Sequence, residues 1–252
     1  ALDKSCVDEQ QLGAIFAGDL LNQCVGSSYG LLPFDVPYFG LYGACSTAVE
    51  GLMLSALMVT HGVFSHCASV ASSHNCTAER QYRTPLEYGG QRPPTAQWTV
   101  TGAGAFVCGA VDDKHARLVE CMPGIVVDKG IKDANNMGAA MAPAAADTLR
   151  RYFKASGREL RDFDLSVTGD HGYEGGAILQ DVLRAEDYDM GERYGDCGQM
   201  IYNKQAQDTH AGGSGCGCSA VVLGAYLLPK LERGELRRVL ILGTGAMMSP
   251  DS

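Results

Sequence analysis

The chain has 252 residues, of which 46% are hydrophobic and 19% charged, a globular composition that excludes a disordered linker. Its 20 basic and 29 acidic residues give a net charge of 20 − 29 = −9, which disfavours a nucleic-acid-binding protein because such proteins need a basic face. No apolar run reaches the roughly 18 residues of a membrane span, so we expect a soluble, acidic protein.

Short β-rich runs alternate with longer helical patterns along the chain. The periodicity predicts strands over residues 12–17, 65–72, 163–168 and 238–242, and helices over residues 48–61, 139–155, 175–185 and 219–233. Residues 98–109 and 116–127 are predicted to form a hairpin with its turn at residues 112–114. Strands that alternate with helices of this length predict an α/β fold with covered sheets.

A faint internal repeat indicates that the fold is duplicated. Residues 14–19 resemble residues 165–170, because each segment is a predicted strand that ends in Gly-Asp. Residues 45–51 resemble residues 218–224, and each of these segments opens an apolar helix. Since both pairs occur in the same order, we predict an architecture of two similar halves.

The two predicted halves are residues 1–96 and 97–252. In the second half a hairpin and a helix precede the Gly-Asp strand, whereas only a short segment precedes its counterpart in the first half. We therefore expect about fifty to seventy residues, a strand-helix unit, to be missing from the N-terminal half.

Ten cysteines are present, but their spacing does not indicate a metal site. No C-x-x-C pair occurs, and the one C-x-C pair, Cys216 and Cys218, lies among glycines rather than near histidines. We expect reduced, mostly structural thiols, no metal and no cofactor.

The segment Gly-Ala-Cys-Ser-Thr at residues 43–47 is the strongest local signal. This tight turn of small residues places Cys45 at the first turn of an apolar helix, where the free amides and the helix dipole favour a reactive thiolate. The alternative is a small residue that only lets the turn pass close to the sheet. A nucleophilic cysteine also needs a base, which is usually histidine.

Two histidines lie where α/β proteins place their sites, at the carboxyl ends of strands or in glycine-rich loops. His171 follows the strand-end Asp170, and His210 precedes the glycine cluster at residues 212–217. The backbone amides of this cluster are candidates for holding an anion. A merely structural role stays open for both histidines.

The segment Glu-Arg-Gln-Tyr-Arg at residues 79–83, together with Arg92, concentrates guanidinium groups in an acidic chain. One interpretation is a solvated loop whose ion pairs contribute little to stability. The other is a clamp for a carboxylate ligand.

Several segments resemble the thiolase and ketoacyl-synthase superfamily. Residues 43–47 are similar to its nucleophile turn, residues 101–105 to its glycine-rich strand, and His210 to the histidine of its Gly-His-Pro loop. Residues 242–246 fit its last strand and turn. Residues 74–98 are far more specific, because they resemble the stage V sporulation protein AD family, a thiolase-like branch, and the resemblance covers essentially the whole chain.

This resemblance implies a thiolase-like, five-layered αβαβα fold of two similar halves, and it also implies the missing N-terminal strand-helix unit. It implies a protein of endospore-forming bacteria that lies at the periphery of the inner spore membrane and acts with membrane-embedded sporulation stage V A proteins. Its expected ligand is dipicolinic acid or the calcium chelate of this acid. The expected site, which corresponds to the thiolase active site, comprises Cys45, Asp170, His171, His210, Gly213 and Ser214.

The sequence also departs from catalytic thiolases. The Asn-Glu-Ala-Phe motif is not visible where residues 169–172 stand, and residues 243–245 replace the Cys-x-Gly acid/base. The leading hypothesis is therefore a non-catalytic binding protein. The alternatives are an acyltransferase in which Cys45 is acylated and His210 tunes it, and a docking subunit that forms a homodimer through the strand at residues 65–72.

Overall fold

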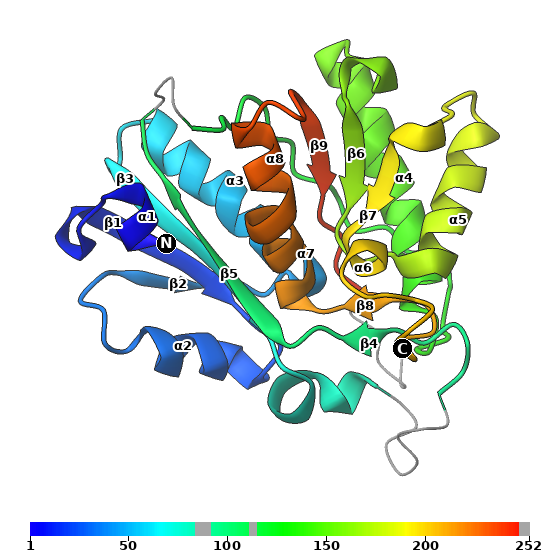
Figure 1. Cartoon of the computed structure of the whole chain (residues 1–252), viewed down its shortest axis with the longest axis horizontal. Coiled ribbons are helices and arrows are strands. Elements are labelled where there is room, and N and C mark those ends of the chain that lie inside the picture. The colour runs from blue at the N-terminus through cyan, green and yellow to red at the C-terminus, as the bar shows by residue number, and fades with distance from the viewer. Residues whose placement is uncertain (84–91, 111–114, 247–252) are drawn as a thin grey trace.

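A computed structural model describes residues 1–83, 92–110 and 115–246. Helices and sheets alternate in five layers: α2, the sheet with β1, the pair α3 and α7, the sheet with β6, and the pair α4 and α5 (Figure 1). The predicted α/β architecture of covered sheets is confirmed. Within the part of the chain that is described, no helix is both long and apolar enough to cross a membrane.

The first sheet has four strands in the order β2-β1-β3-β5. Its central strand β1 (Leu12–Gly18) pairs in parallel with β2 (Tyr38–Gly40) and with β3 (His66–Ser73). On the other side of β3, β5 (Gly102–Cys108) runs antiparallel. The buried strand β1 lies in the middle and is apolar on both faces, as expected for a strand covered by helices on both sides.

The two faces of β1 meet different helices. Ile15 belongs to the apolar cluster on the side of α2 (Val25–Leu31), whereas Phe16 belongs to the cluster on the side of α3 (Thr47–Thr60). The side chains of successive residues in a strand point to opposite faces, so β1 connects the outer helical layer to the central one.

The second sheet has three parallel strands, with β6 (Leu165–Thr168) between β7 (Tyr194–Asp196) and β9 (Val239–Leu242). Its outer face packs on α4 (Met137–Ser156) and α5 (Gly172–Arg184), which share one apolar cluster with residues of β9. The helix predicted over residues 139–155 is thus confirmed.

The central layer contains α3 and a second helical segment that lies beside it (Figure 1). This segment is α7 (Cys216–Val222), which continues through a π-helical turn, Leu223–Leu227, into α8 (Leu228–Glu232). Its buried side chains and those of α3 form one apolar cluster with residues of both sheets. The N-termini of α3 and α7, and the residues around them, are therefore close together in the middle of the molecule.

Four short elements complete the architecture. The two-residue strands β4 (Trp98–Thr99) and β8 (Gly213–Ser214) pair in parallel just before α7. The short helix α6 (Cys197–Met200) follows β7, and α1 (Leu2–Ser5) lies near the N-terminus.

The predicted hairpin is wrong in its second arm. Residues 98–109 contain β4 and β5, but residues 116–127 form no strand. Instead β5 pairs with β3, and the segment after it crosses to α4, where Glu120 accepts hydrogen bonds from Tyr152 and Arg158. The predicted turn, residues 112–114, lies outside the described residues.

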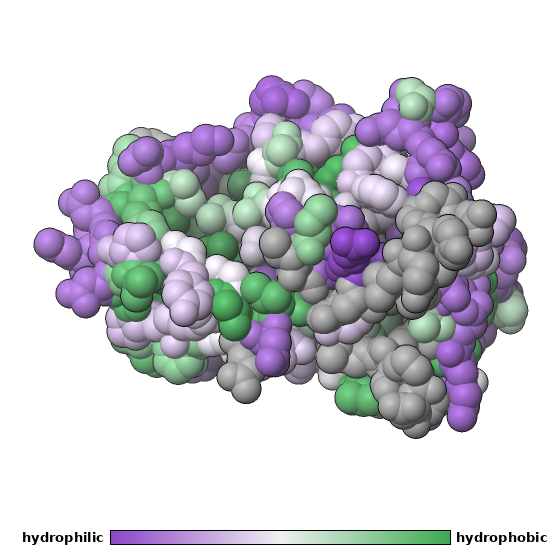
Figure 2. All heavy atoms as spheres, turned by 90° about the horizontal axis from the view of Figure 1, so that it is seen from below, coloured by the Kyte–Doolittle hydropathy of each residue, from purple (hydrophilic) through white to green (hydrophobic). Residues whose placement is uncertain are grey.

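The expected pairing strand also needs correction. The strand predicted at residues 65–72 is β3, and both of its neighbouring positions are occupied, by β1 and by β5. It cannot extend the sheet into a second chain. The sheet edges are β2 and β5, and Figure 2 shows apolar residues gathered toward the end of the molecule that carries α2 and β2. There Leu32, Phe39 and Tyr42 are more than half exposed.

The internal repeat has a structural counterpart. Asp19 and Asp170 each follow a glycine at the carboxyl end of a buried strand, in the first and second sheet respectively. The two apolar helices of the repeat are α3 and α7, the neighbours in the central layer. The boundary between the two halves at residues 96 and 97 stays a prediction.

Candidate functional site

Cys45 lies in a 3₁₀ turn, Ala44–Ser46, that leads directly into α3. The turn is tight: Ala44 has a φ of 51°, in the left-handed region that favours glycine, and the Thr47 hydroxyl donates to the carbonyl oxygen of Ala44 at 2.7 Å. Cys45 is only 6% exposed. The turn therefore packs tightly against the start of α3.

The glycine cluster and the strand-end aspartate meet at Cys45. The Cys45 Sγ is 3.8 Å from the Ser214 Oγ, and this hydroxyl in turn donates to the Asp170 carboxylate at 2.7 Å. The backbone N–H of Gly215 donates to the same carboxylate oxygen at 3.0 Å. The structure therefore brings together Cys45, Asp170 and Ser214, with Gly213 as the other residue of β8.

These surroundings disfavour a thiolate. Burial and the nearby charge of Asp170 raise the pKa of the Cys45 thiol well above its usual value. Burial thus opposes the activation of Cys45 that the helix N-terminus favours, and the alternative of a small structural residue stays open. Burial also raises the pKa of Asp170 itself.

His171 is buried close to this cluster but is not paired with the thiol. Its Nε2 lies 3.3 Å from the hydroxyl of Thr244, and its Nδ1 has no hydrogen-bond partner. Burial lowers the pKa of His171 to about 3, so the ring is neutral at pH 7. Thr244 belongs to residues 243–245, which stand where the resemblance places the Cys-x-Gly acid/base of catalytic thiolases.

His210 has different neighbours. Its Nδ1 lies 2.9 Å from the carbonyl oxygen of Pro93, and its Nε2 lies 2.8 Å from the Asp208 carboxylate. Its φ of 47° and these two contacts fix it in a loop that also contacts Arg92. Among the hydrogen bonds of the described residues, none connects His210 to Cys45.

Asp196, at the end of β7, is a site residue that sequence reasoning missed. Its buried carboxylate accepts hydrogen bonds from the backbone N–H groups of His171 at 2.8 Å and Gly172 at 2.9 Å, and from the Thr168 hydroxyl at 2.7 Å. Burial raises the pKa of Asp196 to about 7, against these hydrogen bonds. The signal was present, because Gly195-Asp196 repeats the Gly-Asp ending of the other two strands.

Glu79 is a second buried carboxylate of the site. It is fully buried, and its Oε2 pairs with the Arg83 Nη2 at 3.2 Å. Burial raises the pKa of Glu79 to about 7, although the charge of Arg83 opposes the shift. A side chain on Gly215, whose φ is +122°, would place its Cβ 2.7 Å from the Glu79 Oε2. The ion pair of Glu79 and Arg83 is therefore not the solvated contact that one interpretation of residues 79–83 expects, whereas Arg80 is exposed.

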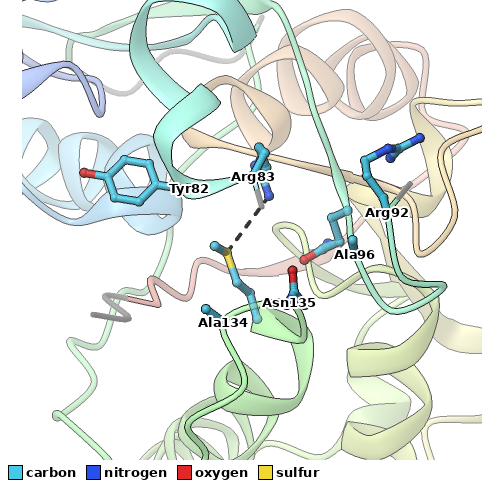
Figure 3. Close-up of a pocket in the computed structure, with 8 residues that line it drawn as sticks. Tyr82, Arg83, Arg92, Ala96, Ala134 and Asn135 are labelled. Carbon is cyan, nitrogen blue, oxygen red and sulfur yellow. Dashed lines mark hydrogen bonds between the residues drawn. The ribbon is translucent and has the colours of Figure 1, made fainter. Parts of the chain in front are cut away.

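Cys45, Asp170, Ser214 and Glu79 together form the Cys45 cluster. A small cavity adjoins this cluster and is drawn in Figure 3. It has a volume of about 10 Å³, the size of one water molecule. Gln97 connects the cavity to the Cys45 cluster, because its Nε2 donates to the carbonyl oxygens of Asp170 at 2.7 Å and Gly213 at 3.1 Å. The lining residues come from three separate segments and are Tyr82, Arg83, Arg92, Ala96, Gln97, Ala134, Asn135 and Met137.

The chemical capacity of the site follows from these contacts. A buried thiol with a raised pKa lies beside a hydroxyl and buried carboxylates, and burial lowers the pKa of the neighbouring imidazole of His171 to about 3. Within the described ranges, no group of three or more His, Cys, Asp or Glu side chains is placed to hold a metal ion. The arrangement is suited to binding through hydrogen bonds more than to proton transfer from Cys45.

Comparison with known sequences gives one consistent result. The profile of the family described as stage V sporulation protein AD (SpoVAD) matches residues 1–252. Stage V sporulation protein AD of Bacillus subtilis (strain 168) is 42% identical over 250 residues, which cover 99% of this chain and 73% of the relative.

Several solved structures superimpose on this chain. OleA of Xanthomonas campestris with bound lauric acid and lauroyl-CoA superimposes with a TM-score of 0.64 at 14% identity, over 97% of this chain and 76% of that one. FabH of Pseudomonas aeruginosa, a 3-oxoacyl-(acyl carrier protein) synthase III, superimposes with a TM-score of 0.61 at 16% identity, over 99% and 81%. The expected thiolase-like fold is confirmed, and at these identities the likeness shows the fold alone.

Proposed function

Because the chain belongs to the stage V sporulation protein AD family and has a role in sporulation, we propose that it is a non-catalytic binding protein for dipicolinic acid or its calcium chelate. It would serve the uptake of this ligand into the developing spore, at the periphery of the inner spore membrane and with membrane-embedded stage V A proteins as partners. The ligand site would be the pocket that corresponds to the thiolase active site.

The observation that carries the proposal is the pairing of Cys45. Its thiol contacts the Ser214 hydroxyl at 3.8 Å, and burial, together with the nearby charge of Asp170, raises the pKa of the thiol. A condensing enzyme needs the opposite, a thiolate stabilised by a nearby base. His171 and His210 make their hydrogen bonds elsewhere, to Thr244 and to Asp208. This scaffold supports binding more than acyl transfer.

Calorimetric titration of dipicolinic acid into the full-length protein, with and without calcium, tests this function. We expect saturable binding by the wild type and a weaker affinity after Cys45→Ala, because the thiol lines the proposed pocket. His210→Ala would test whether the histidine loop takes part. Absence of saturable binding by the folded wild type, in both the presence and absence of calcium, would refute the proposed function.

One observation favours a second function, acyl transfer. Ala44 has a left-handed backbone conformation directly before Cys45, and strained backbone of this kind is concentrated at functional sites. In this case the Cys45 thiol would be acylated by an acyl thioester. Intact-mass measurement after incubation with acyl thioesters of several chain lengths would show an adduct that Cys45→Ala abolishes.

The homodimer also remains a proposal, with a changed location. The exposed side chains Leu32, Phe39 and Tyr42 accompany the edge strand β2, and an unpaired edge strand is suited to joining the same strand of a second copy. Sedimentation analysis of the wild type and of Phe39→Asp would test this. A monomeric wild type at micromolar concentration would contradict it.

A further inference from the structure

Two cysteines lie directly opposite each other in the first sheet. The antiparallel register of β3 and β5 pairs Cys67 with Cys108, and both are free thiols in the structure. The Cα atoms of opposite residues in an antiparallel pair are about 4.5 to 5.5 Å apart, depending on the hydrogen-bonding pattern. Both values fall within the range of about 4.4 to 6.8 Å that a disulfide spans. The backbone is therefore already spaced for a disulfide.

The two thiols also lie on the same face of the sheet. Opposite residues of an antiparallel pair project their side chains to the same side. Cys67 belongs to an apolar cluster with Met58 of α3, and Cys108 packs on the neighbouring cluster, which contains Leu52 of the same helix. Burial, and after it the nearby Cys67 thiol, raises the pKa of Cys108 to about 11. The two sulfur atoms are thus close enough to influence each other.

The pairing of these two cysteines is specific. Among the strand pairs of the described residues, none of the other registers places a cysteine opposite a cysteine. Other buried thiols are held by backbone carbonyl groups, such as Cys24 by Leu41 at 3.1 Å and Cys216 by Ala44 at 2.9 Å. The register of β3 and β5 therefore selects one pair out of the ten cysteines of the chain.

The position of the pair at the edge of the sheet gives an oxidant access to it. β5 is an edge strand, and Cys108 is its last residue. Cys108 is partly exposed, whereas Cys67 is fully buried. The end of an edge strand opens at a low cost in free energy, because few hydrogen bonds have to break. An oxidant can therefore reach Cys108 first, and opening of the end of β5 then exposes Cys67.

We propose that Cys67 and Cys108 form a reversible, redox-sensitive disulfide that fastens β5 to β3. The oxidant is a small organic disulfide of the glutathione class. The Cys108 thiolate attacks one sulfur of this oxidant, its S–S bond breaks, and one small thiol leaves as a mixed disulfide forms. The Cys67 thiolate then attacks the Cys108 sulfur and releases the second small thiol. Two protein thiols are oxidised, and the oxidant is reduced to two thiols that carry the two protons lost by the protein.

The disulfide would enclose a segment that contributes to the Cys45 cluster. The 40 residues between the two cysteines, 68–107, include Glu79 of this cluster and Gln97, which donates to the carbonyl oxygen of Asp170. A cross-link that closes a loop of this length lowers the conformational entropy of the unfolded chain, so the oxidised protein should be more stable than the reduced one. The inference concerns the scaffold and does not rest on the proposed function.

Peptide mapping after oxidation tests the disulfide. The starting protein carries Ser in place of the three exposed cysteines, Cys6, Cys76 and Cys121, and is incubated with oxidised glutathione at mildly alkaline pH, which increases the thiolate fraction. Chymotryptic cleavage after Phe64 and Phe106 places Cys67 and Cys108 on different peptides. We expect mass spectrometry of the unreduced digest to show these two peptides joined, and dithiothreitol to separate them.

Thermal unfolding measures the effect of the cross-link on the scaffold. Oxidation should raise the Tm of the starting protein by at least about 4 °C, and dithiothreitol should reverse the rise. Cys108→Ala in the same protein is the matched control, because it keeps Cys67 but lacks the pair. We expect neither joined peptides nor a higher Tm for this variant, with near-UV circular dichroism confirming that it is folded.

Three results would overturn the proposal. The first is glutathione on Cys108 while Cys67 stays reduced, or no oxidation of either thiol, in protein that is folded throughout. The second is a disulfide between one of these cysteines and any other cysteine. The third is joined peptides without a rise in Tm, because β5 would then not be fastened. If Cys108→Ala does not fold, the starting protein with and without dithiothreitol provides the decision.

Discussion

Asp19 and Asp170 end comparable strands in the two sheets, yet their carboxylates have different neighbours. Asp19 accepts hydrogen bonds from the backbone N–H and the hydroxyl of Ser27, eight residues further along and each at 2.6 Å. Asp170 accepts from Ser214 and Gly215, which are 44 and 45 residues away. The first carboxylate thus stabilises the first turn of α2, whereas the second lies in the site.

The different partners of Asp19 and Asp170 show how one copy of a duplicated Gly-Asp motif can serve a site while the other stabilises a helix. After β1, the strand-end aspartate itself accepts from the amides of the following helix. After β6, the amides of His171 and Gly172 at the start of α5 are bonded by Asp196, which comes from the neighbouring strand β7. Because Asp196 stabilises that helix terminus, Asp170 is available to contact Ser214 beside Cys45.

The largest expected effect comes from adding a side chain at Gly215, whose backbone N–H donates to Asp170. In Gly215→Ala the new Cβ would lie 2.7 Å from the Glu79 carboxylate, on a backbone with a φ of +122° that only glycine adopts easily. We expect a loss of about 3 kcal/mol or more in the free energy of unfolding. Urea denaturation would measure it. Gly234→Ala is the control, because Gly234 also has a positive φ but faces open space, and about 1 kcal/mol is expected.

Asp19→Ala tests whether Asp19 serves only to stabilise the first turn of α2. The substitution removes the acceptor for the Ser27 amide and hydroxyl and for the Leu21 amide, at 2.8 Å. We expect a loss of about 2 kcal/mol in stability, with no change in the affinity of the folded protein for dipicolinic acid. Asp35→Ala, at an exposed position, is the control in the same urea denaturation. Weakened ligand binding without destabilisation would contradict the assignment of Asp19 to structure.

Glu79→Gln tests whether the site around Asp170 contains a buried carboxylate that titrates. Burial raises the pKa of Glu79 from 4.5 to about 7, so the folded protein binds this proton more tightly than the unfolded chain does. The stability of the wild type relative to Glu79→Gln should therefore fall as the pH rises from about 4.5 to 7, by at most about 3 kcal/mol, and then level off. Urea denaturation at pH 5, 6, 7 and 8 measures this difference, and a pH-independent difference would contradict it.

The smallest effect on stability is expected for Asp170→Asn. The amide oxygen can still accept from Ser214 and Gly215, and a neutral group is easier to bury, so a change within about 1 kcal/mol is expected. The charge of Asp170 contributes to the raised pKa of Cys45, so its removal should shift the alkylation of Cys45 to lower pH. Peptide mass spectrometry after iodoacetamide treatment measures this. An unchanged pH profile would mean that burial alone suppresses the thiolate.

Local patterns predicted most of the fold and part of the site. The strands and helices follow from periodicity, and the helix over residues 139–155 ends at Gly157, whose φ of 67° is the left-handed conformation that glycine commonly adopts after a helix. The failed hairpin arm at residues 116–127 shows the limit, because its apolar residues gave a strand pattern, yet β5 pairs with β3 and this segment forms no strand. Pairing of strands is not encoded in the periodicity of one segment.

The sequence by itself determined the covered α/β architecture, the duplicated strand-helix motif and the turn that holds Cys45, because these depend on residues close together in the chain. Tertiary structure alone decided that the Cys45 thiol is buried beside Asp170, that Asp196 holds the amide of His171, and that Cys67 lies opposite Cys108. Burial and charge at a site are sums over residues distant in sequence, and here they raise the pKa of Cys45 against the effect of the helix terminus.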